Sequence, residues 1–143
     1  MLNYINVIAE EKSYSGLQMK EIKPVMKLII RGKKREFLSA IGKSLNLLLP
    51  TEANTSTKSE KLTALWLSPD EWLIYSNKIS NPDNNDYETE NLLTKNITKK
   101  KLGAITDVTD QFILINLKGD KIFDLFETGS PFNFNNFRNK KGS

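Results

Sequence analysis

Two apolar runs joined by a short polar segment lie near the middle of the chain. Residues 64–67 and 72–75 are apolar, and Ser68–Glu71, with the sequence Ser-Pro-Asp-Glu, lies between them. Proline at the second position of a turn fixes its φ angle, and the flanking serine and aspartate favour a type I turn. The pattern therefore predicts a β-hairpin with a four-residue loop. Both tryptophans lie in this hairpin. Burial of one indole ring is worth roughly 4–6 kcal/mol by area, so we expect at least one of them to anchor the core.

A strand and an amphipathic helix are predicted before the hairpin. Val25–Arg31 is mostly apolar and predicts a buried strand, after which Gly32 turns the chain. A helix from about residue 34 to 47 follows, because its apolar residues recur with a helical period. Pro50 ends this helix, and residues 51–59 form a polar loop. The apolar face of the helix comprises Phe37, Leu38, Ile41, Leu45 and Leu48.

A second helix and two further strands are predicted after the hairpin. Residues 77–86 are rich in Asn, Asp and Pro and predict a loop. A weaker helix covers about residues 87–97, with Leu92 and Leu93 as its main apolar anchors. The two strands are expected at residues 102–108 and 112–117.

The order of these elements predicts an α+β fold. Up to Val108 the order is βαββαβ, the split βαβ of ferredoxin-like domains, and a further β-α unit follows. Residues 1–22 show no clear period and predict an irregular N-terminal arm. We therefore expect an arm of residues 1–22 and a single α+β domain of residues 23–143.

The chain also contains two similar segments. Leu28–Gly42 resembles Ile115–Gly129: in each, a strand ends in a basic residue and glycine. A helix then runs to a second glycine, which we expect to serve as its C-cap. Two related strand-Gly-helix units explain this pattern, and two unrelated junctions with similar turn residues explain it equally well.

The residue types that the chain lacks narrow its chemistry. None of the 143 residues is cysteine or histidine. The chain therefore has no disulfide, no thiolate nucleophile and no cysteine-based zinc site. It also lacks a Ser-His-Asp arrangement and an imidazole base. We expect no catalytic, cofactor-binding or metal-binding residues in it.

The positive charge of the chain is mild. The net charge is +4, and the lysines are scattered more than aligned. Lys99–Lys101 and Arg138–Lys141 are short basic runs, but binding of phosphate by a few lysines is weak, roughly 10⁻⁴–10⁻⁶ M. No aromatic residues alternate with these lysines, so we expect solvated faces and no nucleic-acid partner.

Targeting signals are also absent from the sequence pattern. The N-terminus lacks a charged segment followed by a long apolar one, and no run approaches the ~18 apolar residues of a membrane span. We therefore expect a cytoplasmic protein that does not associate with membranes.

Four acidic residues are candidates for a site. Asp70 and Glu71 form an adjacent pair, for which a role in the turn is the favoured interpretation. Asp107 and Asp110 flank Thr109 and could hold a proton or an amine, as an acid does in folate-dependent methylene transfer. No partner base accompanies them, so capping at the end of a strand is favoured.

Two other segments resemble functional motifs. Gly42-Lys43-Ser44 imitates the end of a P-loop, but Phe37 occupies the position of the first glycine, which excludes the motif. Phe132, Phe134 and Phe137 alternate with asparagines and either cover the core or insert into a partner. We favour contact with a partner.

Ala64–Ile74 resembles a signature of the gamma subunit of heterotetrameric sarcosine oxidase, alanine-leucine-tryptophan-leucine-glycine-proline-aspartate-glutamate-tryptophan-leucine. Ser68 replaces the glycine of that turn. The resemblance covers residues 25–143, and the chain ends where family members continue, so we expect it to be short at its C-terminus. Weaker matches follow in the same order at Arg31-Gly32, Leu49-Pro50 with Asn54-Thr55, Thr106–Asp110, and Leu117–Gly119 with Phe123–Phe126.

The resemblance implies a fold like the folate-binding domain of aminomethyltransferases. It also implies a complex that oxidatively demethylates sarcosine to glycine, forming hydrogen peroxide and, with tetrahydrofolate, methylenetetrahydrofolate. The FAD, FMN, NAD and tetrahydrofolate sites would belong to other subunits. This chain would be a non-catalytic subunit that packs against alpha, with beta and delta also in the complex.

Two alternatives remain open at this point. The chain could be a stand-alone folate-binding or aminomethyltransferase-like protein, which a deep apolar pocket with an inward-facing Asp107 or Asp110 would favour. It could instead be an RNA-binding domain, but the strands do not clearly supply aromatic residues for an open sheet face. Self-association of the isolated chain is also left open.

Overall fold

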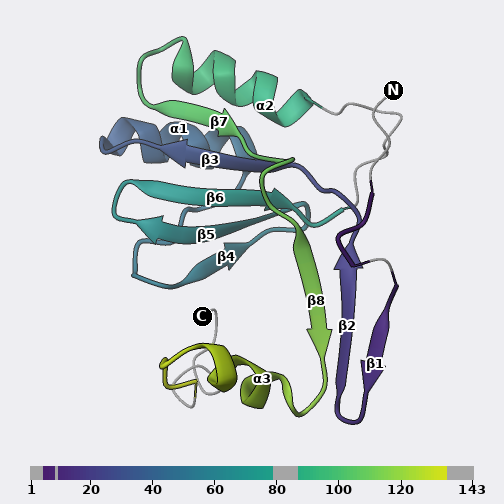
Figure 1. Ribbon diagram of the computed structural model, residues 1–143. Coiled ribbons are helices and arrows are strands. Elements are labelled where there is room, and N and C mark those ends of the chain that lie inside the picture. Colours follow the sequence, from purple (N-terminus) through teal and green to yellow (C-terminus); the bar gives the residue numbers. More distant parts are fainter. Residues whose placement is uncertain (1–4, 9, 79–86, 135–143) are drawn as a thin grey trace. The chain divides into compact units, whose positions relative to one another are not determined.

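Figure 1 shows a computed structural model of the chain, which describes residues 5–8, 10–78 and 87–134. The described residues divide into two compact units. The larger unit is Pro24–Phe112. The smaller unit contains the described residues up to Lys23 together with those from Ile113 onward.

Five strands of the larger unit form one antiparallel sheet. They are β3 (Lys27–Arg31), β4 (Ser56–Lys58), β5 (Leu62–Ser68), β6 (Glu71–Ser76) and β7 (Ala104–Asp107). Their order across the sheet is β4-β5-β6-β3-β7, so the first strand of the unit lies between β6 and β7 (Figure 1). Strand β4 lies within the segment that the sequence predicts to be a polar loop, and it extends one edge of the sheet.

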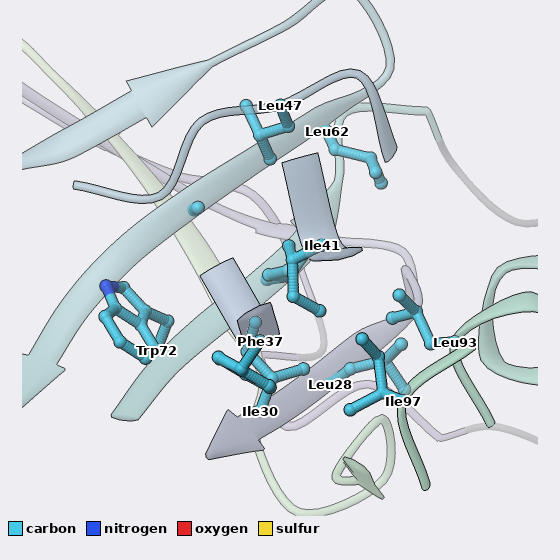
Figure 2. Close-up of a cluster of buried hydrophobic side chains, with 11 residues drawn as sticks. Leu28, Ile30, Phe37, Ile41, Leu47, Leu62, Trp72, Leu93 and Ile97 are labelled. Atoms are coloured by element: carbon cyan, nitrogen blue, oxygen red, sulfur yellow. The ribbon is translucent and has the colours of Figure 1, made fainter. Parts of the chain in front are cut away.

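Helices cover one face of this sheet and enclose the core with it. They are α1 (Arg35–Leu45), α2 (Glu88–Leu93) and the π-helical segment η1 (Thr94–Thr98), which continues α2. Side chains alternate along a strand, so Leu28 and Ile30 of β3 both enter the core, whereas Ile29 faces the other way. Figure 2 shows the core cluster, which comprises Leu28, Ile30, Phe37, Ile41, Leu47, Leu62, Ala64, Trp72, Ile74, Leu93 and Ile97.

The predicted tryptophan hairpin is confirmed as β5 and β6. The strands extend further than expected: Ser68 pairs with Glu71, so only Pro69 and Asp70 connect them, and the register shifts between Trp66 and Ser68. The two indole rings differ in burial, because Trp72 is 3% exposed whereas Trp66 is half-buried. Trp72 is therefore the anchor that the sequence predicts.

Trp72 is held on two sides within the core. Its ring stacks on Phe37 of α1 with centroids 6.0 Å apart and an interplanar angle of 29°. Its Nε1 donates a hydrogen bond to the Pro50 carbonyl oxygen at 2.8 Å. The indole ring thus packs against α1 and bonds the loop after it, and its polar atom is satisfied inside the core.

The end of α1 differs from the prediction. The helix ends at Leu45, and Asn46 terminates it in the left-handed conformation with φ 49°. Gly42 lies inside the helix and is not a C-cap. Leu48 is beyond the helix and 79% exposed, so it does not belong to the apolar face. Asparagine adopts the left-handed conformation at little cost, which lets the chain turn before Pro50.

The anchors of the second predicted helix also differ from the prediction. Leu93 is fully buried, but Leu92 is 39% exposed, and Ile97 supplies the other buried contact. Leu93 and Ile97 are four residues apart and therefore lie on one side of the helix, whereas adjacent leucines cannot both face the core.

The smaller unit contains a three-stranded antiparallel sheet and a helix. The strands are β1 (Lys12–Tyr14), β2 (Leu17–Ile22) and β8 (Leu114–Lys118), in the order β1-β2-β8, and the helix is α3 (Ile122–Gly129). The expectation of an irregular segment is thus wrong for residues 12–22, where Gly16, with φ 78°, allows a tight hairpin turn. The division into an arm and one domain stays a prediction.

The two similar segments each form a strand, a glycine and a helix, but the two glycines are required for different structural reasons. A Cβ atom on Gly32 would overlap the Phe37 ring, so this glycine makes room for a core side chain. A Cβ atom on Gly119, which has φ 131°, would overlap the Gly16 carbonyl oxygen. The different causes favour unrelated junctions over a true repeat.

Candidate functional site

The smaller unit exposes one apolar face of its sheet. The register places Met19 opposite Leu117 and Tyr14 opposite Leu17, so these side chains lie on the same face, together with Ile115. Tyr14 is 60% exposed and Ile115 is 43% exposed. None of the described apolar side chains of this unit is buried. The unit therefore places its apolar residues in a sheet without enclosing them.

Four phenylalanine rings form a second apolar surface in the same unit. Phe134 lies 5.4 Å from Phe126, 5.0 Å from Phe132 and 6.2 Å from Phe123, measured between ring centroids. Phe123 and Phe126 belong to α3, none of whose residues is buried. Phe126 is 40% and Phe132 49% exposed. We call Phe123, Phe126, Phe132 and Phe134 the phenylalanine cluster.

One carboxylate is enclosed in this unit. Glu21 of β2 is 8% exposed and lies on the apolar face of the sheet. Its Oε2 accepts a hydrogen bond from the Ile8 backbone N–H at 2.8 Å. This contact fixes the segment before β1 against the sheet and gives Glu21 a structural role.

Asp70 has the turn role that the sequence favours, whereas Glu71 is not a turn residue: it is the first residue of β6, is opposite Arg31 and Ser68 in the register, and is half-buried. The Asp70 Oδ1 accepts a hydrogen bond from the Ser68 hydroxyl at 3.0 Å, and its carbonyl oxygen accepts one from the Gly32 N–H at 3.0 Å. The hydrogen bond from Ser68 lowers the pKa of Asp70, and Lys33 and Arg31 contribute to the same shift. Glu71 lies 4.0 Å from Arg31. These carboxylates connect the hairpin turn to the end of β3.

Asp107 caps the end of β7, as the sequence favours. Its Oδ1 accepts a hydrogen bond from the Thr109 N–H at 2.8 Å, which closes the turn after the strand. Both Asp107 and Asp110 are exposed, so neither points into the core. This arrangement uses the acid for backbone structure.

A buried lysine is the polar feature that the sequence analysis missed. Lys27 is 2% exposed, and its Nζ donates hydrogen bonds to the carbonyl oxygens of Val25 at 3.1 Å and Thr109 at 2.8 Å. Its backbone N–H donates to the Thr109 hydroxyl at 3.0 Å. Burial lowers the pKa of Lys27, and the charges of Asp110 and Asp107 partly oppose this shift. Lys27 thus fastens the start of β3 to the turn after β7.

We predict that Lys27 makes the stability of the protein rise with pH in the alkaline range. Because the pKa of Lys27 is lower in the folded state than its ordinary value of 10.5, the folded protein releases the proton first as the pH rises. The unfolded state then binds more protons, and the free energy of unfolding increases by up to about 1.4 kcal/mol per pH unit.

Urea unfolding of the protein and of the Lys27→Met variant between pH 8 and pH 10.5 measures this effect. As the pH rises, the free energy of unfolding of the unaltered protein should increase relative to that of the Lys27→Met variant. Parallel pH profiles of the two proteins would show that Lys27 keeps its ordinary pKa on folding.

The other candidate motifs of the sequence gain no chemistry from the structure. Gly42-Lys43-Ser44 lies near the C-terminal end of α1 and not in a loop before a helix. No group of three or more metal-ligating side chains occurs in the ranges that the structure describes. No helix among the described residues is long and apolar enough to cross a membrane. Phe137 and Arg138–Lys141 lie outside the described residues.

Comparison with known proteins gives a consistent result. A model of the sarcosine oxidase, gamma subunit family matches residues 32–141. Among solved structures, a chain of the heterotetrameric sarcosine oxidase from Corynebacterium sp. U-96, in complex with pyrrole 2-carboxylate, is similar in fold, with a TM-score of 0.70 and 18% sequence identity. The match covers 82% of this chain but only 57% of that chain. No curated protein matches the chain.

The family match includes the tryptophan hairpin and the motifs that follow it. The resemblance that these residues carry in the sequence is therefore confirmed by an independent comparison. Since the match spans more than half of the sequence, the chain belongs to the sarcosine oxidase gamma subunit family.

Proposed function

We propose that this protein is the non-catalytic gamma subunit of a heterotetrameric sarcosine oxidase and that it binds the alpha subunit through its smaller unit. One observation carries the proposal: the smaller unit gathers apolar side chains on a sheet face and in the phenylalanine cluster, yet none of those described is buried. Exposed apolar patches of this kind mark protein–protein interfaces. Membership of a gamma subunit family supports a subunit as the partner.

The roles of the candidate acids support a structural rather than a catalytic chain. Asp107 is engaged by the Thr109 N–H, and Asp70 by the Ser68 hydroxyl. In this proposal the FAD, FMN, NAD and tetrahydrofolate sites, and hence the oxidation of sarcosine, belong to the partner subunits. The beta and delta subunits complete the complex, which is cytoplasmic.

We also propose that the larger unit is a split βαβ of the ferredoxin-like kind, as in the folate-binding domain of aminomethyltransferases. The support is its strand order, in which β3 is inserted between β6 and β7 with antiparallel neighbours on both sides. Helices α1 and α2 connect these strands along the chain. The extra strand β4 is an addition at the sheet edge.

Co-expression with the alpha and beta subunits tests the proposed function. We expect the chain to co-elute with them in size-exclusion chromatography at about 0.5 M salt, where loose contacts between charges are screened to within a few ångströms. A chain that elutes alone and binds tetrahydrofolate saturably would refute the proposal in favour of a stand-alone folate-binding protein.

A pair of matched variants locates the interface. Phe126→Ser with Phe132→Ser removes two exposed rings of the phenylalanine cluster, and we expect binding to weaken at least tenfold, since aromatic residues are frequent hot spots. Leu48→Ser is the control, because Leu48 is 79% exposed but lies in the larger unit. Equal affinities of the two variants would exclude the phenylalanine cluster as the contact.

A further inference from the structure

Two basic runs that are distant in sequence meet at one end of the larger unit. Strand β3 ends at Arg31, and β7 begins at Ala104, which is opposite Arg31 in the register. The backbones are in close contact there, because a Cβ atom on Gly103 would overlap the Arg31 carbonyl oxygen. We define the basic end as Arg31, Lys33, Lys34, Arg35, Lys99, Lys100 and Lys101, all of which are exposed.

The cations of the basic end are poorly balanced by carboxylates. Arg31 lies 4.0 Å from Glu71 and Lys33 lies 3.7 Å from Asp70, and both cations are well exposed, with 58% and 82% of their side chains accessible. The other five cations form no ion pair with any residue that the structure describes. Exposed pairs of this kind contribute little to stability. Together with Glu36 in the first turn of α1, the basic end carries seven cations against three carboxylates, so positive charge predominates there.

The positions of several of these cations are unfavourable for the protein on its own. Lys34 is the N-cap of α1 and makes no capping hydrogen bond with its side chain, and Arg35 opens the helix. Cations there face the positive end of the helix dipole. Lys101 adopts the left-handed conformation with φ 55°, which glycine or asparagine would adopt at lower cost. Residues that break such rules are expected where function requires them.

We propose that the basic end contacts an acidic surface of the partner subunit and accelerates assembly by electrostatic attraction. This inference rests on the proposed function, and it adds a second contact that differs in place and chemistry from the phenylalanine cluster. Complementary charges chiefly raise the rate of association, whereas apolar contacts set the rate of dissociation.

The same surface is less suited to nucleic acid than to an acidic protein. Proteins that bind single strands stack bases on exposed aromatic rings. Phe37, whose ring contacts Gly32 and Gly103, and Trp72 are both buried, at 0% and 3% exposure, and Trp66, opposite Trp72 in the hairpin, is half-buried against the core. A basic surface whose neighbouring rings are mostly enclosed in the core favours a protein partner over a nucleic acid.

Association kinetics with the purified alpha–beta subunits test this inference. The triple variant Lys99→Glu, Lys100→Glu, Lys101→Glu reverses one side of the basic end. We expect it to associate at least tenfold more slowly than the unaltered chain at 0.05 M salt, with a nearly unchanged dissociation rate. At 0.5 M salt the difference should largely disappear, because the charges are then screened.

A second triple variant provides a matched control. Lys58, Lys61 and Lys78 are exposed and lie at or next to the ends of β4, β5 and β6 that are opposite to the basic end. Their replacement by glutamate changes the net charge by the same amount, and we expect association within twofold of the unaltered chain. A Lys→Gln triple at positions 99–101 should give an intermediate association rate. Urea midpoints are measured for all variants to check that each one is folded.

The outcomes separate this inference from the proposed function. Equal association rates of the two glutamate triples, or slowing that salt does not remove, would overturn the role of the basic end and leave the subunit assignment intact. If the unaltered chain forms no complex, both proposals fail. A third outcome would assign the surface to another partner. In that outcome the unaltered chain binds a 20-nucleotide single strand or anionic vesicles, and the glutamate triple at positions 99–101 abolishes this binding without slowing assembly.

Discussion

Replacing Trp72 with alanine is expected to lower the free energy of unfolding of the larger unit by about 3–5 kcal/mol, the usual cost of truncating a buried aromatic residue. The ring is 3% exposed, stacks on Phe37 and donates a hydrogen bond to the Pro50 carbonyl oxygen. Its loss would leave a cavity between β6 and α1 and would free the loop after the helix. Since small domains are stable by about 5–15 kcal/mol, this single change should bring the unit close to unfolding.

Trp66→Ala is the matched control, because this indole ring belongs to the same hairpin but is only half-buried. We expect a loss of roughly 1–2 kcal/mol from it. Trp72→Phe retains a ring in the core but removes the Nε1 donor and part of the indole volume, so it should cost about 1–3 kcal/mol. Urea unfolding followed by circular dichroism measures all three variants. A cost for Trp66→Ala as large as that for Trp72→Ala would mean that both rings anchor the core equally.

The tryptophan hairpin and the β3–α1 segment were predictable because their local patterns agree with their packing. The proline turn, the apolar runs around it and the helical period after Gly32 each indicate a single structure. The choice between Leu92 and Leu93 could not be made in the same way. Two adjacent leucines have equal hydrophobicity, and only the position of the helix on the sheet decides that Leu93 is buried.

The β1–β2 hairpin escaped prediction because its signal is weak. Leu17 and Met19 alternate with Gln18 and Lys20, which is too short a pattern to indicate a strand. Gly16 alone marks the turn. Besides β1, the pairing partner of β2 is β8, which lies about a hundred residues further along the chain. A strand stabilised by so distant a neighbour leaves little trace in its own local sequence.

The burial of Lys27 was equally out of reach of the sequence. Lysine is almost always exposed, so a lysine at the start of a strand predicts a solvated side chain. It is buried here because the Thr109 carbonyl oxygen, 82 residues away in sequence, accepts its hydrogen bond. The basic end arises in the same manner, since the β3–β7 pairing brings together two runs that look like separate solvated segments.

Replacing Gly119 with alanine is expected to disrupt the smaller unit while the larger unit remains folded. Gly119 has φ 131°, a conformation that residues with a side chain adopt only under strain, and a Cβ atom there would overlap the Gly16 carbonyl oxygen. The same oxygen accepts a hydrogen bond from the Lys121 N–H at 3.1 Å. Strain and overlap together should cost about 3 kcal/mol, which a unit whose described apolar side chains are all partly exposed has little stability to absorb.

Amide hydrogen exchange distinguishes the two units in this variant. Amides of β2 and β8 should lose protection, whereas those of β3 and β6 keep it, and the emission of both tryptophans should be unchanged because both belong to the larger unit. Gly129→Ala is the control, since no atom of the described residues lies within 4 Å of the Cβ position there. Loss of protection in both units would show that they fold as one. If Gly119→Ala unfolds only the smaller unit, it should also abolish the proposed binding to the alpha subunit, because the phenylalanine cluster lies in that unit.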